Sequence, residues 1–479
     1  MLFNSLDFAV FLPVVFLTYW ILLNRNLQIQ NLFLLIASYL FYGWWDIRFL
    51  GLIVWSSLVD YWIGISLSRV TKPQYRKLLL SLSLLMNIGL LGFFKYYNFF
   101  IESFAQAYSL FGAQINPSRL DIILPVGISF YTFQTLSYTI DVYRKKLTPT
   151  KDIVAFFAFV SFFPQLVAGP IERATNLLPQ FFKKRRFNYA TATDGCKQIL
   201  WGLAKKVIIA DQCARYANDI FNNHDQYSGS TLVVGAFFFT FQIYGDFSGY
   251  SDIAIGTAKL FGFNLKKNFA TPYFSRDIAE FWRRWHISLS TWFRDYLYIP
   301  LGGSRVGKWL NVRNVFIVFI VSGFWHGANW TFVIWGTFNA ILFLPLLLSN
   351  RNRSNLDTVA SGRFIPHIKE VFQIFITFLL TMVAWIFFRA DNLSHAVSYI
   401  SKIFSSSIIV LPEIRPSNMF LYLLFFILFE WIGREREHVL NHKFFNSYNW
   451  FKYPLYFILM ALILIHSNGT PEEFIYFQF

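Results

Sequence analysis

No charged side chain interrupts the 18 residues Val371-Phe-Gln-Ile-Phe-Ile-Thr-Phe-Leu-Leu-Thr-Met-Val-Ala-Trp-Ile-Phe-Phe388. A helix needs about 20 mainly apolar residues to cross the roughly 30 Å hydrocarbon core of a bilayer. The segment therefore predicts a membrane-spanning helix. Comparable stretches occur at Phe8–Leu23, Asn31–Trp45, Leu50–Leu67, Leu78–Phe94, Ile122–Ile140, Met419–Ile432 and Tyr453–His466. The pattern predicts an all-α polytopic membrane protein.

The composition of the chain agrees with this prediction. Of 479 residues, 55% are hydrophobic and 14% are charged, whereas soluble domains carry about 25% charged residues. These values exclude a cytosolic enzyme, a disordered chain and a secreted disulfide scaffold. Cys196 and Cys213 have no zinc-ligand spacing, and we expect no metal site. The net charge is +16, and the basic residues lie between the apolar stretches. This placement favours the lipid bilayer over nucleic acid as the partner.

Three further apolar stretches contain residues that break helices. They are Ile153–Gly169 with Pro164, Thr231–Phe263 with Gly245-Asp-Phe-Ser-Gly249, and Val315–Leu348 with Gly323 to Gly327. Such interruptions favour re-entrant segments that return to the side from which they enter. A fourth segment, Ala190–Phe221, mixes apolar positions with lysines, and we expect it to lie in the membrane interface. A plain connecting helix is the alternative.

Lys and Arg residues between the stretches predict the orientation, because cytoplasmic loops retain them. If the basic loops Ser68–Lys77 and Arg144–Lys151 face the cytoplasm, both chain termini lie outside. One membrane domain, 1–479, then consists of N-terminal helices (1–143), a core with re-entrant segments (144–369) and C-terminal helices (370–479).

His326 lies in Ser322-Gly-Phe-Trp-His-Gly-Ala-Asn-Trp330, inside an apolar region. An ionisable group at membrane depth is costly and marks a function by default. Imidazole is the natural general base for deprotonating a hydroxyl near neutral pH, so we predict that His326 is catalytic. We expect Asn329 on the same helical face, orienting the ring or a substrate carbonyl, with Trp325 as a further substrate contact. The alternative is a histidine whose one hydrogen bond stabilises helix packing.

His286 ends the aromatic and basic segment Glu280-Phe-Trp-Arg-Arg-Trp-His286. An amphipathic helix on the membrane surface has the same composition. Arg283 and Arg284 are equally suited to binding the phosphates of a donor such as coenzyme A, with Trp285 beside them. The two interpretations are compatible.

A third polar segment is Asp246-Phe-Ser-Gly-Tyr-Ser-Asp252. Its carboxylates are too loosely spaced to indicate a metal site or acid–base pair. We expect Asp246, Tyr250, Ser251 and Asp252 to line a substrate passage, and helix capping is the alternative.

Several motifs resemble the membrane-bound O-acyltransferase family, and within it the bacterial alginate O-acetylation branch. They are Pro125-Val-Gly-Ile-Ser-Phe-Tyr131, Phe163-Pro-Gln-Leu-Val-Ala-Gly-Pro170, Asp246-Phe-Ser-Gly-Tyr-Ser-Asp252, Phe281-Trp-Arg-Arg-Trp-His286, Tyr298-Ile-Pro-Leu-Gly-Gly303, Gly323-Phe-Trp-His-Gly-Ala-Asn-Trp330 and the ending Phe474-Ile-Tyr-Phe-Gln-Phe479. The D-alanyl transferases of teichoic acid share the fold and many of these motifs.

The resemblance implies about eleven transmembrane helices, with re-entrant and interfacial helices, around a central funnel or tunnel. It places the family's invariant histidine at His326 and the second at His286. It further implies transfer of an acyl group, acetyl in this branch, from a cytoplasmic thioester such as acetyl-CoA, with no bound cofactor. The implied acceptor is an extracytoplasmic polysaccharide or a partner acetyltransferase, and the implied location is the cytoplasmic (inner) membrane.

Two other classes of function remain open from the residues. A transporter or flippase also has broken helices and intramembrane polar residues. A scaffold in a polysaccharide-export complex requires no chemistry at His326.

Overall fold

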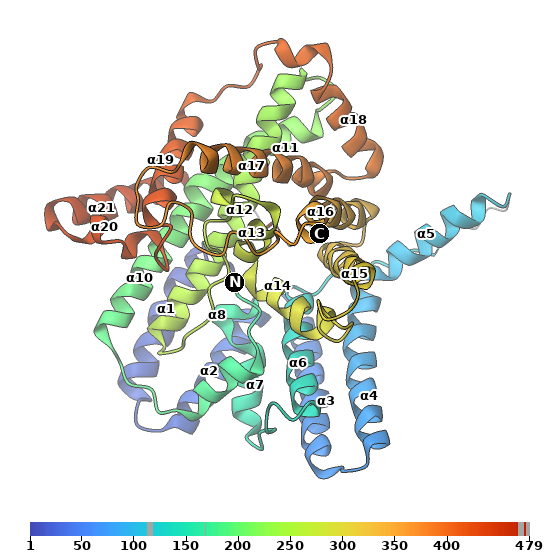
Figure 1. The fold of residues 1–479 in the computed structure, drawn as a ribbon. Coiled ribbons are helices and arrows are strands. Elements are labelled where there is room, and N and C mark those ends of the chain that lie inside the picture. The colour runs from blue at the N-terminus through green and yellow to red at the C-terminus, as the bar shows by residue number, and fades with distance from the viewer. Residues whose placement is uncertain (113–117, 168, 468–473, 476–479) are drawn as a thin grey trace. The chain divides into compact units, whose positions relative to one another are not determined.

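The computed structural model describes residues 1–112, 118–167, 169–467 and 474–475. These residues form helices and loops and contain no strand, which confirms the all-α class for the described part of the chain (Figure 1). They divide into two compact units. The first comprises Met1–Ala192 and Ala258–Leu265, and the second comprises Thr193–Thr257 and Lys266–Phe479.

The first unit contains the N-terminal helices. They are α1 (Leu6–Leu17), η1 (Thr18–Leu22), α2 (Leu27–Gly43), α3 (Ile47–Arg69), α4 (Pro73–Leu91), η2 (Gly92–Tyr96), α5 (Tyr97–Ser109), α6 (Ile128–Tyr143), α7 (Ile153–Ser161), α8 (Phe163–Leu166), α9 (Ala174–Leu177) and η3 (Leu178–Phe182).

A buried carboxylate joins three of these helices. Asp60 of α3 accepts hydrogen bonds from Ser83 Oγ (2.5 Å) and Asn87 Nδ2 (2.8 Å) of α4 and from Thr139 Oγ1 (2.9 Å) of α6. Figure 1 shows α3 and α4 side by side. A polar group inside an apolar bundle is tolerated when its hydrogen bonds are made by the protein itself. These donors therefore fix how α3, α4 and α6 pack together.

The second unit holds most of the remaining helices. They are α10 (Tyr189–Ala204), which begins in the first unit, η4 (Lys205–Ala210), α11 (Asp211–Asn222), α12 (Gly229–Leu260), η5 (Pro272–Phe274), α13 (Ile278–Arg284), α14 (Ile287–Phe293), η6 (Arg294–Tyr298), α15 (Lys308–His326), α16 (Trp330–Leu348), α17 (Ile368–Arg389), α18 (Leu393–Ile403), η7 (Ser406–Ile409), α19 (Ser417–Gly433), η8 (Val439–Asn441), α20 (Lys443–Asn446) and α21 (Asn449–His466).

Among the described residues, five helices are long and apolar enough to cross a membrane: α3, the run Pro73–Ser109, α16, α17 and α21. Shorter apolar helices cover Leu6–Leu22, Leu27–Gly43, Ile153–Leu166 and Ser417–Gly433. Each predicted span coincides at least in part with one of these helices except Ile122–Ile140, where α6 begins only at Ile128. Gly127 precedes α6 with φ of +75°, and a Cβ there would lie 2.8 Å from the Leu166 carbonyl oxygen.

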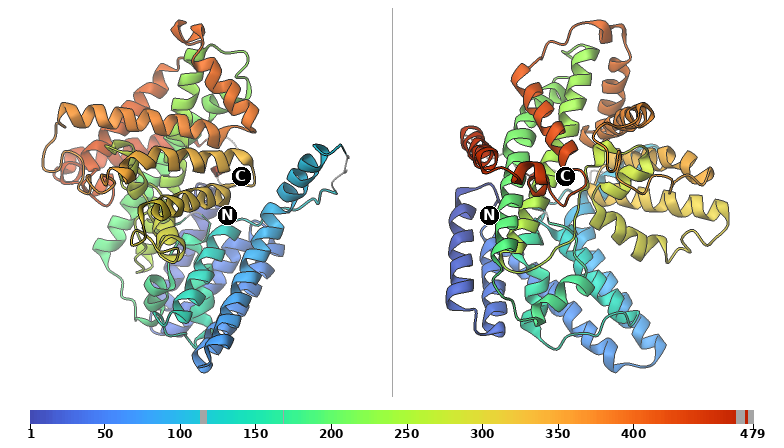
Figure 2. Two further views of the ribbon diagram at one scale, coloured as in Figure 1. Left: turned by 45° about the vertical axis from the view of Figure 1, so that its right-hand side comes forward. Right: turned by 60° about the vertical axis from the view of Figure 1, so that its left-hand side comes forward.

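Two of the three predicted interruptions are confirmed. The helix in Ile153–Gly169 breaks at Phe162, between α7 and α8. In Val315–Leu348, α15 ends at His326 and α16 starts at Trp330. Figure 2 shows α15 and α16 packed against each other as a hairpin.

The predicted interruption of Thr231–Phe263 is wrong, because α12 is one continuous helix over Gly229–Leu260. Its glycines serve close packing instead. A Cβ on Gly249 would lie 2.8 Å from the Gly202 carbonyl oxygen, and one on Gly256 would lie 2.6 Å from that of Gly195. Glycine therefore lets the backbone of α12 touch that of α10.

The same packing buries the middle of Ala190–Phe221, for which we expected a location in the membrane interface. Lys205 and Lys206 are 4% and 1% exposed, whereas a helix lying in the interface directs its lysines to water. Lys197 is half-buried and Arg215 is exposed, so the interfacial location of the segment stays a prediction.

Replacing Gly256 with alanine tests the contact between α10 and α12. The added methyl meets backbone, which cannot rotate away, so we expect a loss of about 1–3 kcal/mol of stability, as in other overpacked cores. Thermal unfolding of the detergent-purified variant measures it. Gly89→Ala in α4, where nothing lies within 4 Å of the added carbon, is the matched control, and equal melting temperatures for the two variants would contradict the assignment.

Candidate active site

His326 is the last residue of α15. Gly327 follows with extended backbone, φ −159° and ψ 153°, and a side chain there would overlap the ring of Phe332. Only glycine fits beneath that ring. The helix ends at His326, and the chain resumes as α16 at Trp330. The imidazole therefore lies at the turn of a helical hairpin.

Three aromatic rings enclose the imidazole of His326, which is 3% exposed. Its centroid lies 5.0 Å from that of Trp325, 5.2 Å from that of Trp335 and 5.5 Å from that of Phe388. These residues come from α15, α16 and α17. The enclosure excludes bulk water and holds the ring between three helices.

Asn329 lies on the other side of the helix break. Its Oδ1 accepts a hydrogen bond from Thr331 N at 3.0 Å, which makes it the N-cap of α16, and its Nδ2 donates to the Asp391 carbonyl at 2.8 Å. The expectation that Asn329 shares a helical face with His326 is therefore wrong. Its amide supports the turn after His326.

His286 occupies the junction between α13 and α14 and is 1% exposed. Its backbone adopts φ of +43°, a left-handed conformation that costs a non-glycine residue about 1–3 kcal/mol and is concentrated at functional sites. The Nδ1 atom lies 3.1 Å from Asn268 Oδ1, and Ser288 Oγ donates to the same oxygen at 2.9 Å. Sequence analysis did not identify Asn268, which lies in no recognisable motif.

The two histidines flank one indole. The Trp325 ring lies 6.2 Å from the ring of His286 and 5.0 Å from that of His326, centroid to centroid. A second aromatic connection runs through Trp285, whose ring is 4.9 Å from Trp385, and Trp385 stacks on Trp335 at 5.6 Å. The fold thus brings together His286, His326, Trp285 and Trp325.

Burial lowers the pKa of His286 to about 3. The pKa shifts downward because desolvation disfavours the charged form of a base. The imidazole is therefore neutral across the physiological range, with one nitrogen protonated and the other able to accept a proton.

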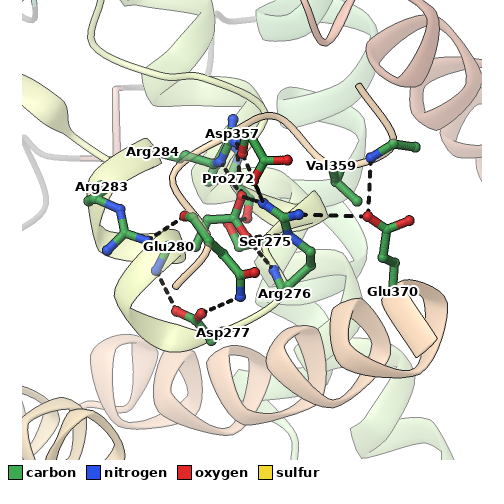
Figure 3. A network of polar contacts seen from close by, with 12 residues as sticks. Pro272, Ser275, Arg276, Asp277, Glu280, Arg283, Arg284, Asp357, Val359 and Glu370 are labelled. Carbon is green, nitrogen blue, oxygen red and sulfur yellow. Dashed lines mark hydrogen bonds and ion pairs between the residues drawn. The ribbon is translucent and has the colours of Figure 1, made fainter. Parts of the chain in front are cut away.

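Arg283 and Arg284 hold a neighbouring loop against α13 (Figure 3). Arg283 donates to the carbonyl oxygens of Asn352 and Asn355, both at 2.7 Å. Arg284 donates to Glu280 Oε1 at 3.0 Å and to the Asp357 carbonyl at 2.7 Å. Phosphate binding by either arginine would require these contacts to open.

Arg276 completes this network beneath the same loop. Its guanidinium makes two hydrogen bonds to Glu280, at 3.0 and 3.1 Å, and one to Asp357 Oδ1 at 2.9 Å. The bond from Arg276 holds the pKa of Asp357 below its usual range. Figure 3 shows Arg276, Arg284 and Glu280 converging on the loop that carries Asp357.

The segment from Asp246 to Asp252 forms ion pairs with two consecutive lysines of η4. Lys206 Nζ lies 2.9 Å from Asp246 Oδ1 and 2.7 Å from Asp211 Oδ1, and Lys205 Nζ lies 2.5 Å from Asp252 Oδ2. Sequence analysis missed this pairing. The signal was present as two lysines in an apolar run and two aspartates in another.

Tyr250 lies next to these ion pairs, with the centroid of its ring 5.6 Å from Lys206 Nζ. Its ring is 4.5 Å from that of Phe474, and Ile475 N donates to Asp246 Oδ2 at 2.7 Å. The rest of the ending motif, residues 476–479, lies outside the described residues.

A small polar pocket with a volume of about 30 Å³ lies beside this segment. Its lining includes Ser251, Asp252 and Asn268, together with the cations Lys205, Lys267 and Arg436 and the acids Glu430 and Glu437. Of the predicted passage residues, Ser251 and Asp252 therefore line a pocket, whereas Asp246 and Tyr250 are buried behind it. Within the described ranges, no group of three or more acidic, histidine or cysteine side chains is placed to hold a metal ion.

Comparison with known proteins gives consistent matches over most of the chain. The sequence model of the membrane-bound O-acyltransferase family matches residues 144–388. The chain is 42% identical to a probable alginate O-acetylase of Pseudomonas putida, over 88% of this chain and 83% of that protein. It is 34% identical to a peptidoglycan O-acetyltransferase of Helicobacter pylori, over 99% and 91% of the two chains. A teichoic acid D-alanyltransferase of Streptococcus thermophilus is 28% identical over 60% and 75%.

Replacing Lys206 with methionine tests the ion-pair cluster. The change leaves Asp211 and Asp246 buried without their cation, and removing one partner of a buried pair costs about 3–5 kcal/mol. We expect a strongly lowered melting temperature in detergent, and a smaller loss for Lys206→Arg. Exposed Lys308→Met is the control, and wild-type stability of the Lys206→Met protein would rule out a structural role for the cluster.

Proposed function

This chain is a member of the membrane-bound O-acyltransferase family, and we propose that it transfers an acetyl group from a cytoplasmic thioester to a hydroxyl of an extracytoplasmic polysaccharide. The observation that carries the proposal is the burial of His326 inside an aromatic enclosure at a helix break, with a second buried histidine across one indole.

The wider architecture of the proposal follows the family resemblance. About eleven transmembrane helices, with re-entrant segments, surround a funnel or tunnel in the cytoplasmic (inner) membrane. The Lys and Arg residues between the spans favour an orientation with both termini outside. The apolar helices of both units support membrane insertion.

His326 acts as the general base. It takes the proton of the acceptor hydroxyl as that oxygen attacks the thioester carbonyl carbon. The carbon–sulfur bond then breaks, and His326 returns the proton to the departing thiolate. General-base catalysis of this kind raises the rate by about 10²–10⁴-fold. The thioester donor stays on the cytoplasmic side, so its charged carrier does not have to cross the bilayer.

The donor side is assigned to His286, and the small polar pocket lies next to it through Asn268. Acetyl-CoA or another acyl thioester is the substrate there, and no resident cofactor takes part. Three basic and three acidic side chains line the pocket, and Lys205 among them is paired with Asp252.

The oxyanion that forms during attack needs a hydrogen-bond donor. The side-chain amide of Asn329 is already hydrogen-bonded to the backbone of Thr331 and Asp391. Trp335 is better placed: its indole is 1% exposed, its ring lies 5.2 Å from that of His326, and its Nε1 has no hydrogen-bond partner among the described residues. We assign the oxyanion contact to Trp335.

The similar proteins favour acetyl over D-alanine, because the relatives named for O-acetylation are more identical and cover more of the chain. Two of them are named for alginate and for peptidoglycan, so the acceptor class is a polysaccharide hydroxyl. A partner acetyltransferase outside the membrane, which passes the group on, is part of the proposal.

Replacing His326 with alanine in the cell tests the function. We expect acetyl esters on the extracytoplasmic polysaccharide to fall by about 10²-fold or more, with unchanged protein level in the membrane. Alkaline release of acetate from purified polysaccharide measures the esters. His367→Asn, at the exposed N-cap of α17, is the control. Normal acetylation by His326→Ala would favour a scaffold, and polysaccharide movement without dependence on any acyl donor would favour a transporter.

Replacing Trp335 with phenylalanine keeps the aromatic enclosure and removes the N–H. Loss of one oxyanion donor lowers kcat by about 10²–10³-fold, and we expect little change in KM for acetyl-CoA. Thiol release is followed in proteoliposomes loaded with alginate or with peptidoglycan fragments, which also distinguishes the two acceptors. An unchanged kcat would remove Trp335 from the mechanism.

A further inference from the structure

Asn268 is fully buried and contacts His286 through its side chain and Ile287 through its backbone. Its side-chain oxygen lies 3.1 Å from His286 Nδ1, and its carbonyl oxygen accepts a hydrogen bond from Ile287 N at 2.9 Å. One residue on the neighbouring segment therefore holds the imidazole and the peptide unit that follows it.

The direction of the hydrogen bond to His286 is fixed by a third contact. Ser288 N, which can only donate, lies 3.2 Å from the same Asn268 atom, and Ser288 Oγ lies 2.9 Å from it. That atom must therefore be the amide oxygen and not the amide nitrogen. An oxygen facing His286 Nδ1 accepts, so Nδ1 carries the proton of the neutral ring and Nε2 carries the lone pair.

The left-handed backbone of His286 makes this support necessary. Main-chain hydrogen bonds flank the strained residue on both sides, from Ala270 N to the Arg284 carbonyl at 3.0 Å and from Ile287 N to the Asn268 carbonyl at 2.9 Å. Backbone hydrogen bonds from the segment 268–270 thus hold His286 at φ +43°.

The other end of the Asn268 amide connects to α12. Its Nδ2 donates to Ser251 Oγ at 3.1 Å, and Ser251 and Asn268 both line the polar pocket. Ser251 belongs to the segment between Asp246 and Asp252, whose ion pairs with η4 fix α12 locally. A chain of contacts therefore runs from the lysine pairs through Ser251 and Asn268 to His286.

We propose that Asn268 is a positioning residue that sets the Nδ1–H tautomer of His286, so that Nε2 is the nitrogen offered to the reaction. The inference rests on the function proposed above, to which it adds the tautomer and the residue that selects it. Asn268 acts through His286, and Ser251 acts through Asn268.

The tautomer is measured directly by magic-angle-spinning NMR of protein labelled with ¹⁵N in its histidine rings and reconstituted in lipid. The spectrum of His286→Gln identifies the His286 signals by difference. In the wild type we expect a protonated Nδ1 and an unprotonated Nε2. Asn268→Leu removes the acceptor, and we expect the Nδ1–H signal to be lost and acetyl transfer to fall by more than tenfold.

Asn268→Asp provides the conservative rescue, since a carboxylate oxygen still accepts from Nδ1 and from Ser288. We expect it to keep the Nδ1–H signal and to restore transfer to within about tenfold of wild type. The substitution also places a negative charge beside the imidazole. This charge raises the pKa of His286 and shifts the pH profile of acetyl transfer to higher pH. Ser251→Ala, a milder change, is expected to lower transfer a few-fold without changing the tautomer.

Asn314→Ala is the matched control, because Asn314 is equally buried and bonds to the carbonyl oxygens of Leu301 and Gly303. It is expected to lower stability and leave the tautomer and pH profile unchanged. Wild-type NMR signals or rates in Asn268→Leu would overturn the positioning role. If Asn268→Leu does not fold, an Asn268→Asp protein with an unshifted pH profile would overturn it. A wild type with the expected tautomer and no acetyl transfer would instead overturn the proposed function alone.

Discussion

The pairing of Lys206 with Asp246 and Asp211 is the interaction on which the second unit depends. An ionised group inside an apolar protein is tolerated only when the protein supplies its partner, since neither lipid nor bulk water does so. The pair fixes η4 against α12, and glycines at 249 and 256 allow the backbones of α10 and α12 to touch. Asp60 in the first unit and Arg276 with Glu280 in the second obey the same constraint.

The two histidines are held by different physical means. Rings of three helices enclose His326, and a glycine turn ends its helix. His286 is held by hydrogen bonds to one asparagine and by a backbone conformation that costs free energy. Apolar enclosure excludes water from a base, whereas hydrogen bonds select one tautomer of a ring. The difference matches the separate acceptor and donor roles proposed for them.

Much of this architecture could be predicted from the sequence, because an apolar run of sufficient length has few alternatives to a helix. The break after His326 was also predictable, since Gly323 and Gly327 lie in one apolar run. The same reasoning failed for Gly245 and Gly249, which are packing positions in a continuous helix. A glycine pattern does not distinguish a bend from a close helix contact, because the partner helix is not visible in the sequence. The burial of Lys205 and Lys206 could not be predicted for a similar reason, since lysines paired with buried aspartates and lysines facing lipid headgroups give the same composition.

The sequence by itself determined the class of protein, the apolar helices and the two histidines, because charge depletion and an ionisable residue in an apolar run are local properties. Only the tertiary structure decided that Asn329 caps a helix, that Arg283 and Arg284 anchor a loop, and that Asn268 contacts His286. These contacts join segments that are separated along the chain. Each pairs a donor with an acceptor, and a sequence motif does not show that pairing. The roles of polar residues in this protein depend on which donors and acceptors the fold has already paired.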